Sequence, residues 1–373
     1  MKLSLALSGR FCSDGPESTP FGPFLLATPC SWDETVGMLP VPVTKTSARF
    51  VPDPTRVITK PFTPGSERSV DGRSRVERIL SRILALSESE VTTTLSTTQA
   101  RFAARHVDLR SVFEANFAAV AAGHVARADE LSAERRLLIG AYFTHEYSFE
   151  STALSNPSIV PAPDQEGLAP GEQRFVLSLR AIGPDQEGLA PGEQRFVLSL
   201  RAIGEGHISS IEFRSGVIDA GGQIEMEAPS RHASIARHRA PVYEKHIFHT
   251  KLRELDVYNG IAATVLDALP DRFTLEQLEA MIREVDQQYR HRPDAAHVTR
   301  TIHWLASSNY ESSFAPDSKL SERVLFPAGP TESSGMEDAR FVRFTRDDGT
   351  ATYFALYTAF DGYQVLPQLI ETA

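Results

Sequence analysis

Polar residues able to take part in binding or catalysis gather in four short segments of the sequence. Each segment adjoins a turn or the end of an expected strand, where functional residues are common because a rigid scaffold holds the loop. None shows the ligand spacing of a metal site, a phosphate-binding glycine loop or a nucleophilic serine turn. The segments are THEYS at 144–148 leading to NPSI at 156–159, RA at 201–202 (repeated at 180–181) followed by EGHISS at 205–210, GMEDAR at 335–340, and YTAFDG at 357–362.

Taken singly, these segments are typical of turns. Asn156-Pro157 is a common turn pair, residues 337–340 suit a solvated turn with a local ion pair, and Asp361-Gly362 suits a hairpin corner. His145 and His207 are more typical of structural histidines than of a catalytic base. A functional role therefore requires a fold that brings the segments together.

The chain is expected to be helical between residues 70 and 140. Apolar residues recur at intervals of three and four from Val76 to Leu84, which places them on one face of a helix. Ser87 followed by Glu90 is the pattern of a capping box and predicts the start of a second helix. Further helical stretches are expected around Phe113 and Ile139, and we expect the whole region to be structural.

After Gly140 the pattern changes to short alternating runs, which predict strands. These include residues 175–179 and 208–213, and a hairpin from 341–344 to 353–357 around Asp347-Asp348-Gly349. Helical spacing returns from about residue 243 to 293, where Thr274 and Gln277 form another capping box. The sequence thus predicts a helical insertion flanked by strands.

A tandem repeat lies within the strand region. Pro163–Gly183 recurs without a change at Pro184–Gly204. Solenoid repeats diverge and come in larger numbers, so two identical copies are not a repeat architecture. Only one strand can fill a given place in a sheet with a buried face. One copy is therefore expected to be surplus to the fold and to loop out or add at an edge.

Composition limits the classes of function. A formal net charge of −10 argues against a broad nucleic-acid interface, which needs a basic face. Cys12 and Cys30 could pair, but two cysteines cannot staple a whole fold or form a zinc site of their own. No run approaches the roughly 20 apolar residues that span a bilayer, and the apolar start is too short for a signal peptide. The sequence predicts a cytoplasmic protein without a membrane partner.

The four segments also resemble the motifs of a known family, in sequence and in order. From about Arg56 to the C-terminus, the stretches GAYFTHEYSFESTALSNPSIV, GEGHISSIEFRSGVID, SGMEDARFVRF and YFALYTAFDG follow one another. In this order the chain resembles the long bacterial members of glycoside hydrolase family 130, the β-mannoside phosphorylases and β-mannosidases. The resemblance implies an oligosaccharide substrate and a five-bladed β-propeller that binds sugar at its central funnel.

The expected fold class is α+β or mainly β, with a partial propeller of about two blades, because family members continue past the position of Ala373 with the remaining blades. The expected organisation is an irregular leader at 1–45, an extended segment and helical region at 46–140, and an incomplete propeller at 141–373. The propeller carries the duplication 163–183/184–204 and the helical insertion at about 243–293.

The resemblance also implies roles for individual residues. Asp338 matches the aspartate of a Gly-x-Glu-Asp-Pro-Arg motif, the general acid of an inverting reaction, with Ala339 in place of the proline. A general acid must hold its proton near neutral pH, which burial or a neighbouring carboxylate promotes, and Glu337 is such a neighbour. Asn156 matches a residue that contacts the sugar at the cleavage site. Glu337, Arg340 and Asp361 complete the expected substrate-binding set.

Two reaction types remain open. Arg201, or Arg180 if the first copy fills the sheet, matches an arginine that binds inorganic phosphate in the phosphorylases. A planar guanidinium suits that contact. A second phosphate-binding arginine would fall near Ser210 and is missing, which favours hydrolysis. A hydrolase needs a base about 6.5–9.5 Å from the acid. Asp361 is one candidate and a residue of the remaining blades is the other, and the sequence does not decide between them. No cofactor is expected, apart from phosphate as co-substrate of a phosphorylase.

Two alternatives describe a protein that is not an enzyme. The same residues could hold a sugar without turnover, in a carbohydrate-binding or scaffold propeller, or the chain could be an inactive fragment. Sugar linkage and self-association into a homo-oligomer are left open by the sequence.

Overall fold

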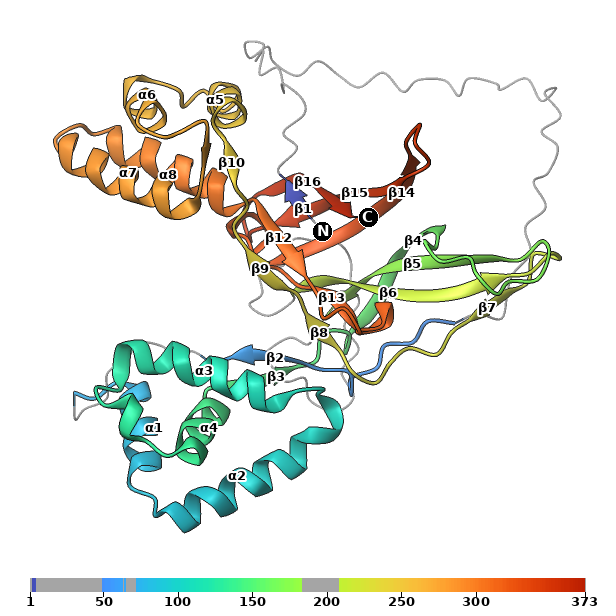
Figure 1. The fold of residues 1–373 in the computed structure, drawn as a ribbon, viewed down its shortest axis with the longest axis horizontal. Coiled ribbons are helices and arrows are strands. Elements are labelled where there is room, and N and C mark those ends of the chain that lie inside the picture. Colours follow the sequence, from blue (N-terminus) through green and yellow to red (C-terminus); the bar gives the residue numbers. More distant parts are fainter. Residues whose placement is uncertain (1, 5–48, 63, 65–71, 183–207, 373) are drawn as a thin grey trace, which may run out of the picture.

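A computed structural model describes residues 2–4, 49–62, 64, 72–182 and 208–372 (Figure 1). Within these residues the chain is a mixed α and β protein, with eight α-helices and one large sheet of twelve strands beside two small two-stranded sheets. Helices account for more of it than the description "mainly β" allows. Cys12, Cys30 and Arg201 fall outside the described residues.

The expected N-terminal helical region is confirmed. Ser74 and Ser87 each begin a helix with a complete capping box, in which the serine side chain accepts from the backbone three residues on and Glu77 or Glu90 bonds back. Buried apolar side chains of the four helices form one core. The helices are α1 (Arg75–Leu84), α2 (Glu88–Phe102), α3 (Leu109–His124) and α4 (Ala133–Tyr142).

The first half of the large sheet is an antiparallel meander that follows the helices. Its strands are β4 (Ala153–Pro161), β5 (Gln173–Ile182), β6 (Ser209–Ile218) and β7 (Ile224–Met226). A tight turn joins β6 to β7, with Asp219 Oδ1 accepting from the backbone of Gly221 and Gln223. Strand β2 (Ile58–Pro61) pairs with β3 (Thr144–Tyr147) beside this meander.

The tandem repeat supplies strand β5 from its first copy. Gln173–Ile182 lies between β4 and β6 and is hydrogen-bonded to both. The place in the sheet is therefore filled by residues 173–182 of the first copy. The second copy, Pro184–Gly204, lies outside the described residues.

The second half of the sheet is built around the expected C-terminal hairpin. β14 (Gly335–Thr345) and β15 (Ala351–Phe360) are longer than the sequence suggests, and β16 (Val365–Thr372) follows. Strand β1 (Lys2–Ser4) lies between β16 and β12 (Tyr310–Ser313), whereas an irregular leader was expected there. Short strands complete the sheet: β8 (Ser234–Ile235), β9 (Arg237–Arg239) and β13 (Arg323–Leu325).

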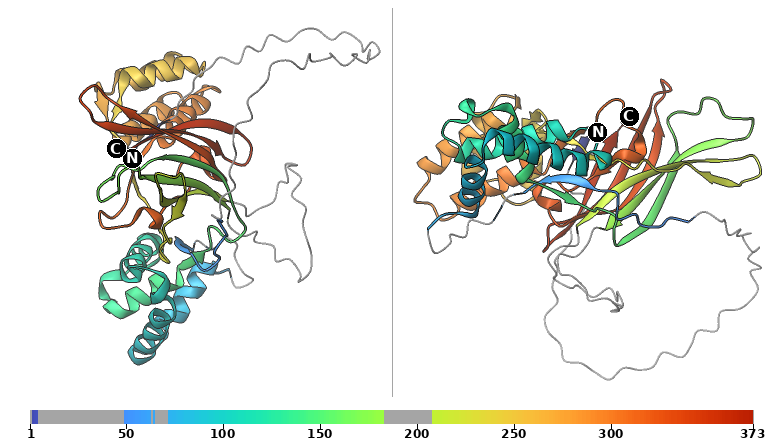
Figure 2. Two further views of the ribbon diagram at one scale, coloured as in Figure 1. Left: turned by 90° about the vertical axis from the view of Figure 1, so that its right-hand side faces the viewer. Right: turned by 90° about the horizontal axis from the view of Figure 1, so that it is seen from below.

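The two halves stack on each other. They meet where Gly335 of β14 pairs in parallel with Ser209 of β6. Beyond this point the strands diverge, and β14–β16 lie over β4–β6 in the left view of Figure 2. A shared core fills the space nearest the junction. Its buried members are Ile211, Phe213, Tyr310, Leu325, Met336, Ala339, Ala355, Tyr357, Ala359 and Ile370.

The helical insertion extends further than expected, to residue 307. Thr274 and Gln277 form the predicted capping box at the start of α7. The insertion has its own apolar core, which includes Leu252, Ile261 and Ile302. Its helices are α5 (Lys245–Glu254), α6 (Gly260–Asp267), α7 (Leu275–Gln288) and α8 (Ala295–Ser307), next to the small sheet of β10 (Tyr243–Glu244) and β11 (Arg272–Phe273).

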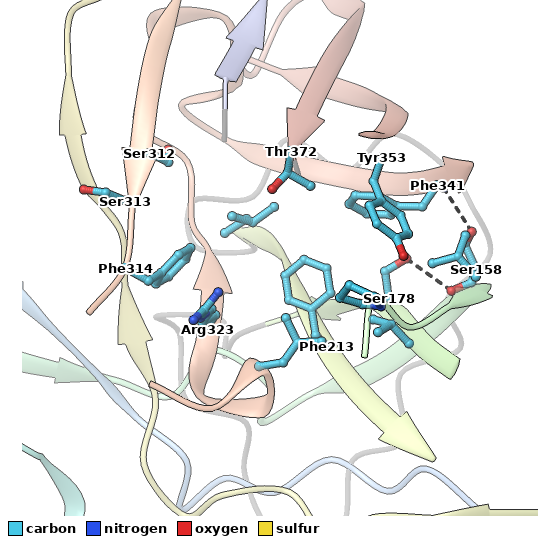
Figure 3. Close-up of a pocket in the computed structure, with 15 residues that line it drawn as sticks. Ser158, Ser178, Phe213, Ser312, Ser313, Phe314, Arg323, Phe341, Tyr353 and Thr372 are labelled. Carbon is cyan, nitrogen blue, oxygen red and sulfur yellow. Dashed lines mark hydrogen bonds between the residues drawn. The ribbon is translucent and has the colours of Figure 1, made fainter. Parts of the chain in front are cut away.

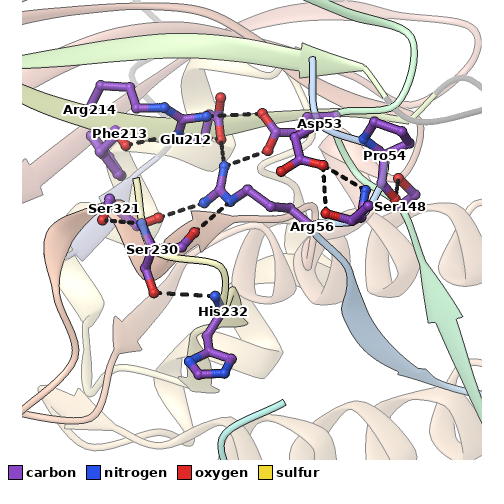
Figure 4. A network of polar contacts seen from close by, with 12 residues as sticks. Asp53, Pro54, Arg56, Ser148, Glu212, Phe213, Arg214, Ser230, His232 and Ser321 are labelled. Carbon is purple, nitrogen blue, oxygen red and sulfur yellow. Dashed lines mark hydrogen bonds and ion pairs between the residues drawn. The ribbon is translucent and has the colours of Figure 1, made fainter. Parts of the chain in front are cut away.

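Four buried charges tie the extended segment before β2 to the first meander (Figure 4). Arg56 Nη1 lies 2.6 Å from both Glu150 Oε1 and Glu212 Oε2. Arg214 contacts the same two carboxylates at 3.0 and 2.7 Å. Arg56 also donates to the backbone oxygens of residues 230 and 321. When both carboxylates are ionised, the two positive and two negative charges of the group balance.

Candidate functional site

Two irregular positions in the sheet form the candidate site. The pairing of β4 with β5 shifts between Ser155 and Ser158, and the pairing of β14 with β15 shifts between Glu337 and Arg340. Such β-bulges re-aim side chains and are frequent beside active sites. Inside each bulge one residue has a left-handed backbone, Asn156 with φ 51° and Asp338 with φ 55°. The two bulges are therefore formed by residues singled out in the sequence.

The two bulges meet. The Asn156 side-chain amide donates a short hydrogen bond to Asp338 Oδ1, although 182 positions separate them in sequence. Arg340 reinforces the contact, since its Nη1 donates to the backbone oxygens of Asn156 at 3.1 Å and Pro157 at 2.8 Å. Asn156 and Asp338 are half-buried and Arg340 is exposed. Three predicted site residues from two strands thus form one cluster that solvent reaches.

Glu337 lies beside this cluster but is held by a different strand. Its Oε1 accepts a hydrogen bond of 3.1 Å from the Ser209 hydroxyl on β6. Ser209 belongs to the second segment of the sequence, so this contact brings that segment next to the GMEDAR segment. Ser210, the position where a second phosphate-binding arginine was expected, is fully buried and its hydroxyl has no hydrogen-bond partner among the described residues.

Of the two duplicated arginines, Arg180 belongs to the described residues. Arg180 lies on β5 at the register position opposite Ser155, the neighbour of Asn156, and opposite Ile211 of β6. Arg201 lies outside the described residues. The backbone position of Arg180 adjoins the bulge of β4.

Asp361 takes a structural part in the turn between β15 and β16. Its Oδ1 accepts from the backbone N–H groups of Tyr363 at 2.8 Å and Gln364 at 2.6 Å. That oxygen is occupied by the turn itself, as expected of an Asp at a hairpin corner. The structure does not bring this carboxylate into the Asn156–Asp338 contact.

Glu332 supports the segment that enters β14 and was not singled out in the sequence. It is fully buried and accepts hydrogen bonds from the hydroxyls of Tyr310 and Tyr357, the latter at 2.5 Å. The backbone of Ala328 and Gly329 also donates to it. Burial, together with the charge of Glu332, raises the pKa of both tyrosines well above the ordinary value. No sequence signal marks Glu332, because the two tyrosines that donate to it lie 22 and 25 positions away in the chain.

His145 has the structural role expected of it. It pairs with Lys60 across β3 and β2, and its ring lies edge-on to Phe62 at a centroid distance of 6.3 Å. Burial, assisted by the charge of Lys60, lowers the pKa of His145 below its ordinary value. His207 lies outside the described residues.

The part of the chain that the structure describes holds no group of three or more metal-binding side chains. None of its helices is both long and apolar enough to cross a bilayer. Comparisons with family models, curated proteins and solved structures found no match to this chain.

Proposed function

We propose that this chain is a carbohydrate-active protein of the glycoside hydrolase family 130 type, which cleaves β-mannosides with inversion and uses Asp338 as the general acid. The observation that carries the proposal is the contact between Asn156 and Asp338. Two residues matched to a sugar-binding asparagine and an acid come from separate strands, share a rare backbone conformation and meet at a half-exposed position. Strained residues of this kind cluster at functional sites.

The proposed function includes a propeller architecture, and the arrangement of the strands supports it. Each half of the sheet is an antiparallel meander, and the first strand of each, β4 or β14, carries the bulge that contributes to the site. In the proposal these halves are two neighbouring blades, and β4 and β14 line the funnel. A sugar hydroxyl entering between the bulges would meet the carboxylate of Asp338 and the amide of Asn156.

The reaction would proceed by proton transfer to the departing sugar. Protonation of the glycosidic oxygen by a positioned carboxylic acid removes the need to expel an alkoxide. In a phosphorylase, inorganic phosphate attacks the opposite face of the sugar. In a hydrolase, a base-activated water takes that place. The proposed substrate is an oligosaccharide with a terminal β-mannoside.

The proposal is tested by incubating the protein with a panel of β-mannosyl disaccharides, with and without inorganic phosphate, and identifying the products. Mannose 1-phosphate indicates phosphorolysis, and free mannose without mannose 1-phosphate indicates hydrolysis. Arg180→Ala and Arg201→Ala form a matched pair, because their local sequences are identical. For a phosphorylase we expect the larger rise in the KM for phosphate with Arg180→Ala.

Absence of both turnover and binding across the panel would contradict the proposal. Binding without turnover would instead support a non-catalytic sugar-binding protein. Turnover that does not depend on phosphate, with no effect of Arg180→Ala, would assign hydrolysis.

A further inference from the structure

A cleft lies between the two stacked halves of the sheet, next to the bulges (Figure 3). Its volume is about 340 Å³, which falls within the range of small-molecule binding sites. Neither Asn156 nor Asp338 lines it. Most of its wall is apolar or aromatic. The apolar and aromatic side chains of the wall include Val176, Phe213, Phe314, Phe341 and Tyr353.

Arg323 is the cation among the residues that line the cleft. It lies on β13, is partly buried, and has its guanidinium carbon 5.6 Å from the Phe314 ring centroid. Its Nε and Nη2 each donate to Ser318 at 3.0 Å, to the hydroxyl and the backbone oxygen. Within the described residues no carboxylate forms an ion pair with it. A guanidinium with neutral partners beside an apolar cavity favours an anionic ligand.

The other polar groups of the wall are already hydrogen-bonded within the protein. Tyr353 Oη donates to the backbone oxygen of Pro161 at 2.9 Å, and Ser158 Oγ accepts from the backbone of Phe341 at 3.2 Å. Ser178 Oγ donates to the backbone oxygen of Ala339 at 3.3 Å. Arg323 is therefore the group that would orient a ligand.

The apolar wall indicates what the rest of the ligand is. Phe213 and Phe341 lie edge-to-face, with ring centroids 5.9 Å apart and an angle of 66° between them. They belong to β6 and β14, so they face each other from the two halves of the sheet. A third aromatic ring can extend such an arrangement with favourable edge-to-face contacts.

We propose that this cleft binds a small aryl carboxylate, with its carboxylate on Arg323 and its ring against Phe213 and Phe341. The proposal concerns a second ligand site and does not depend on the carbohydrate chemistry of the bulges. Because the ligand would contact both halves of the sheet, its binding would stabilise their packing.

The probe is 4-phenylbutyrate, titrated into the full chain by calorimetry, with 4-phenylbutyramide as its uncharged counterpart. We expect saturable binding of one carboxylate per chain, with at least about tenfold weaker binding of the amide, since a charge-assisted hydrogen bond is lost. Arg323→Gln should weaken binding of the carboxylate to a similar extent. Arg346→Gln, at the exposed hairpin turn, is the matched control and should bind like the parent.

A second variant tests the cavity itself without removing a core contact. Val176→Phe places extra volume in the cleft and should abolish binding of the carboxylate. Equal affinity for the carboxylate and the amide in the parent protein would overturn the proposal, and so would undiminished binding by Val176→Phe. Failure of the parent to bind 4-phenylbutyrate would overturn it as well.

Discussion

Asn156 and Asp338 hold a backbone conformation that most residues avoid. A left-handed backbone brings Cβ close to the carbonyl oxygen and costs on the order of 1 kcal/mol, less for Asn and Asp than for other side chains. The conformation persists because Arg340 and the hydrogen bond between the two side chains hold both bulges. Both residues were identified in the sequence through the motifs that contain them. It could not reveal their conformation, because Asn-Pro and Glu-Asp pairs are ordinary in relaxed turns.

Substitution of Asn156 by Gly or Ala tests this strain. Both changes remove the same side-chain hydrogen bond, so the difference between them reports on the backbone alone. Glycine lacks Cβ, and Asn156→Gly should be more stable than Asn156→Ala by about 1 kcal/mol in chemical unfolding. At Ser155, which has no positive φ, the order should reverse because glycine weakens a regular strand. An Ala variant at 156 as stable as the Gly variant would argue against a left-handed position.

The buried charges around Glu150 predict a pH dependence of stability. Burial and the nearby Glu212 raise the pKa of Glu150 from 4.5 to about 7, despite the two arginines. Between these values the folded protein holds a proton that the unfolded chain has released. Stability is therefore lost as the pH rises through the folded pKa. Glu150→Gln cannot titrate and should remove this loss.

The measurement is the free energy of unfolding in urea at about pH 5 and about pH 8 for the parent and for Glu150→Gln. The parent should lose more stability between the two pH values than the variant does. A slope that is identical in both proteins would show that Glu150 does not titrate in this interval. The sequence did not predict this group of four charges, because most of its ion pairs join residues from distant segments.

At the scale of elements, local patterns predicted local structure. The capping boxes at Ser87 and Thr274 begin helices where expected, because the residues that decide a helix start lie within one turn. The hairpin of β14 and β15 was identified through its turn at residues 347–349. Strands β1, β12 and β13 were missed. Each has three or four residues and is defined by pairing with distant strands, which leaves no periodic signal.

Deletion of Pro184–Gly204 tests the account of the duplicated strand. Since β5 is formed by the first copy, the deletion leaves every described strand pair intact and shortens the connection between β5 and β6. A shorter closed loop costs less entropy, by roughly 1 kcal/mol. The melting temperature should stay unchanged or rise. A fall of several degrees in differential scanning calorimetry would mean that the second copy contributes to the fold.

At the scale of the whole molecule, two meanders stack so that their first strands bring the bulges together. The outer face of the second half stays uncovered in the described structure, with Val342, Phe344 and Leu356 each more than half exposed. Exposed apolar surface of this kind often marks an interface. Self-association of the chain, left open by the sequence, stays a prediction. Stacking depends on contacts between strands far apart in sequence, and local patterns do not specify it.

The central claim is that Asp338 donates a proton to the departing sugar, and a comparison of leaving groups tests it most directly. A sugar leaving group needs protonation, whereas 2,4-dinitrophenolate departs without it. Asp338→Asn should lower kcat/KM on a β-mannosyl disaccharide by roughly 10²–10⁴-fold. On 2,4-dinitrophenyl β-mannoside the loss should be far smaller. Asp347→Asn, in the exposed hairpin turn, is the matched control. Equal losses on the two substrates, or no loss on either, would contradict the assignment of Asp338 as the acid.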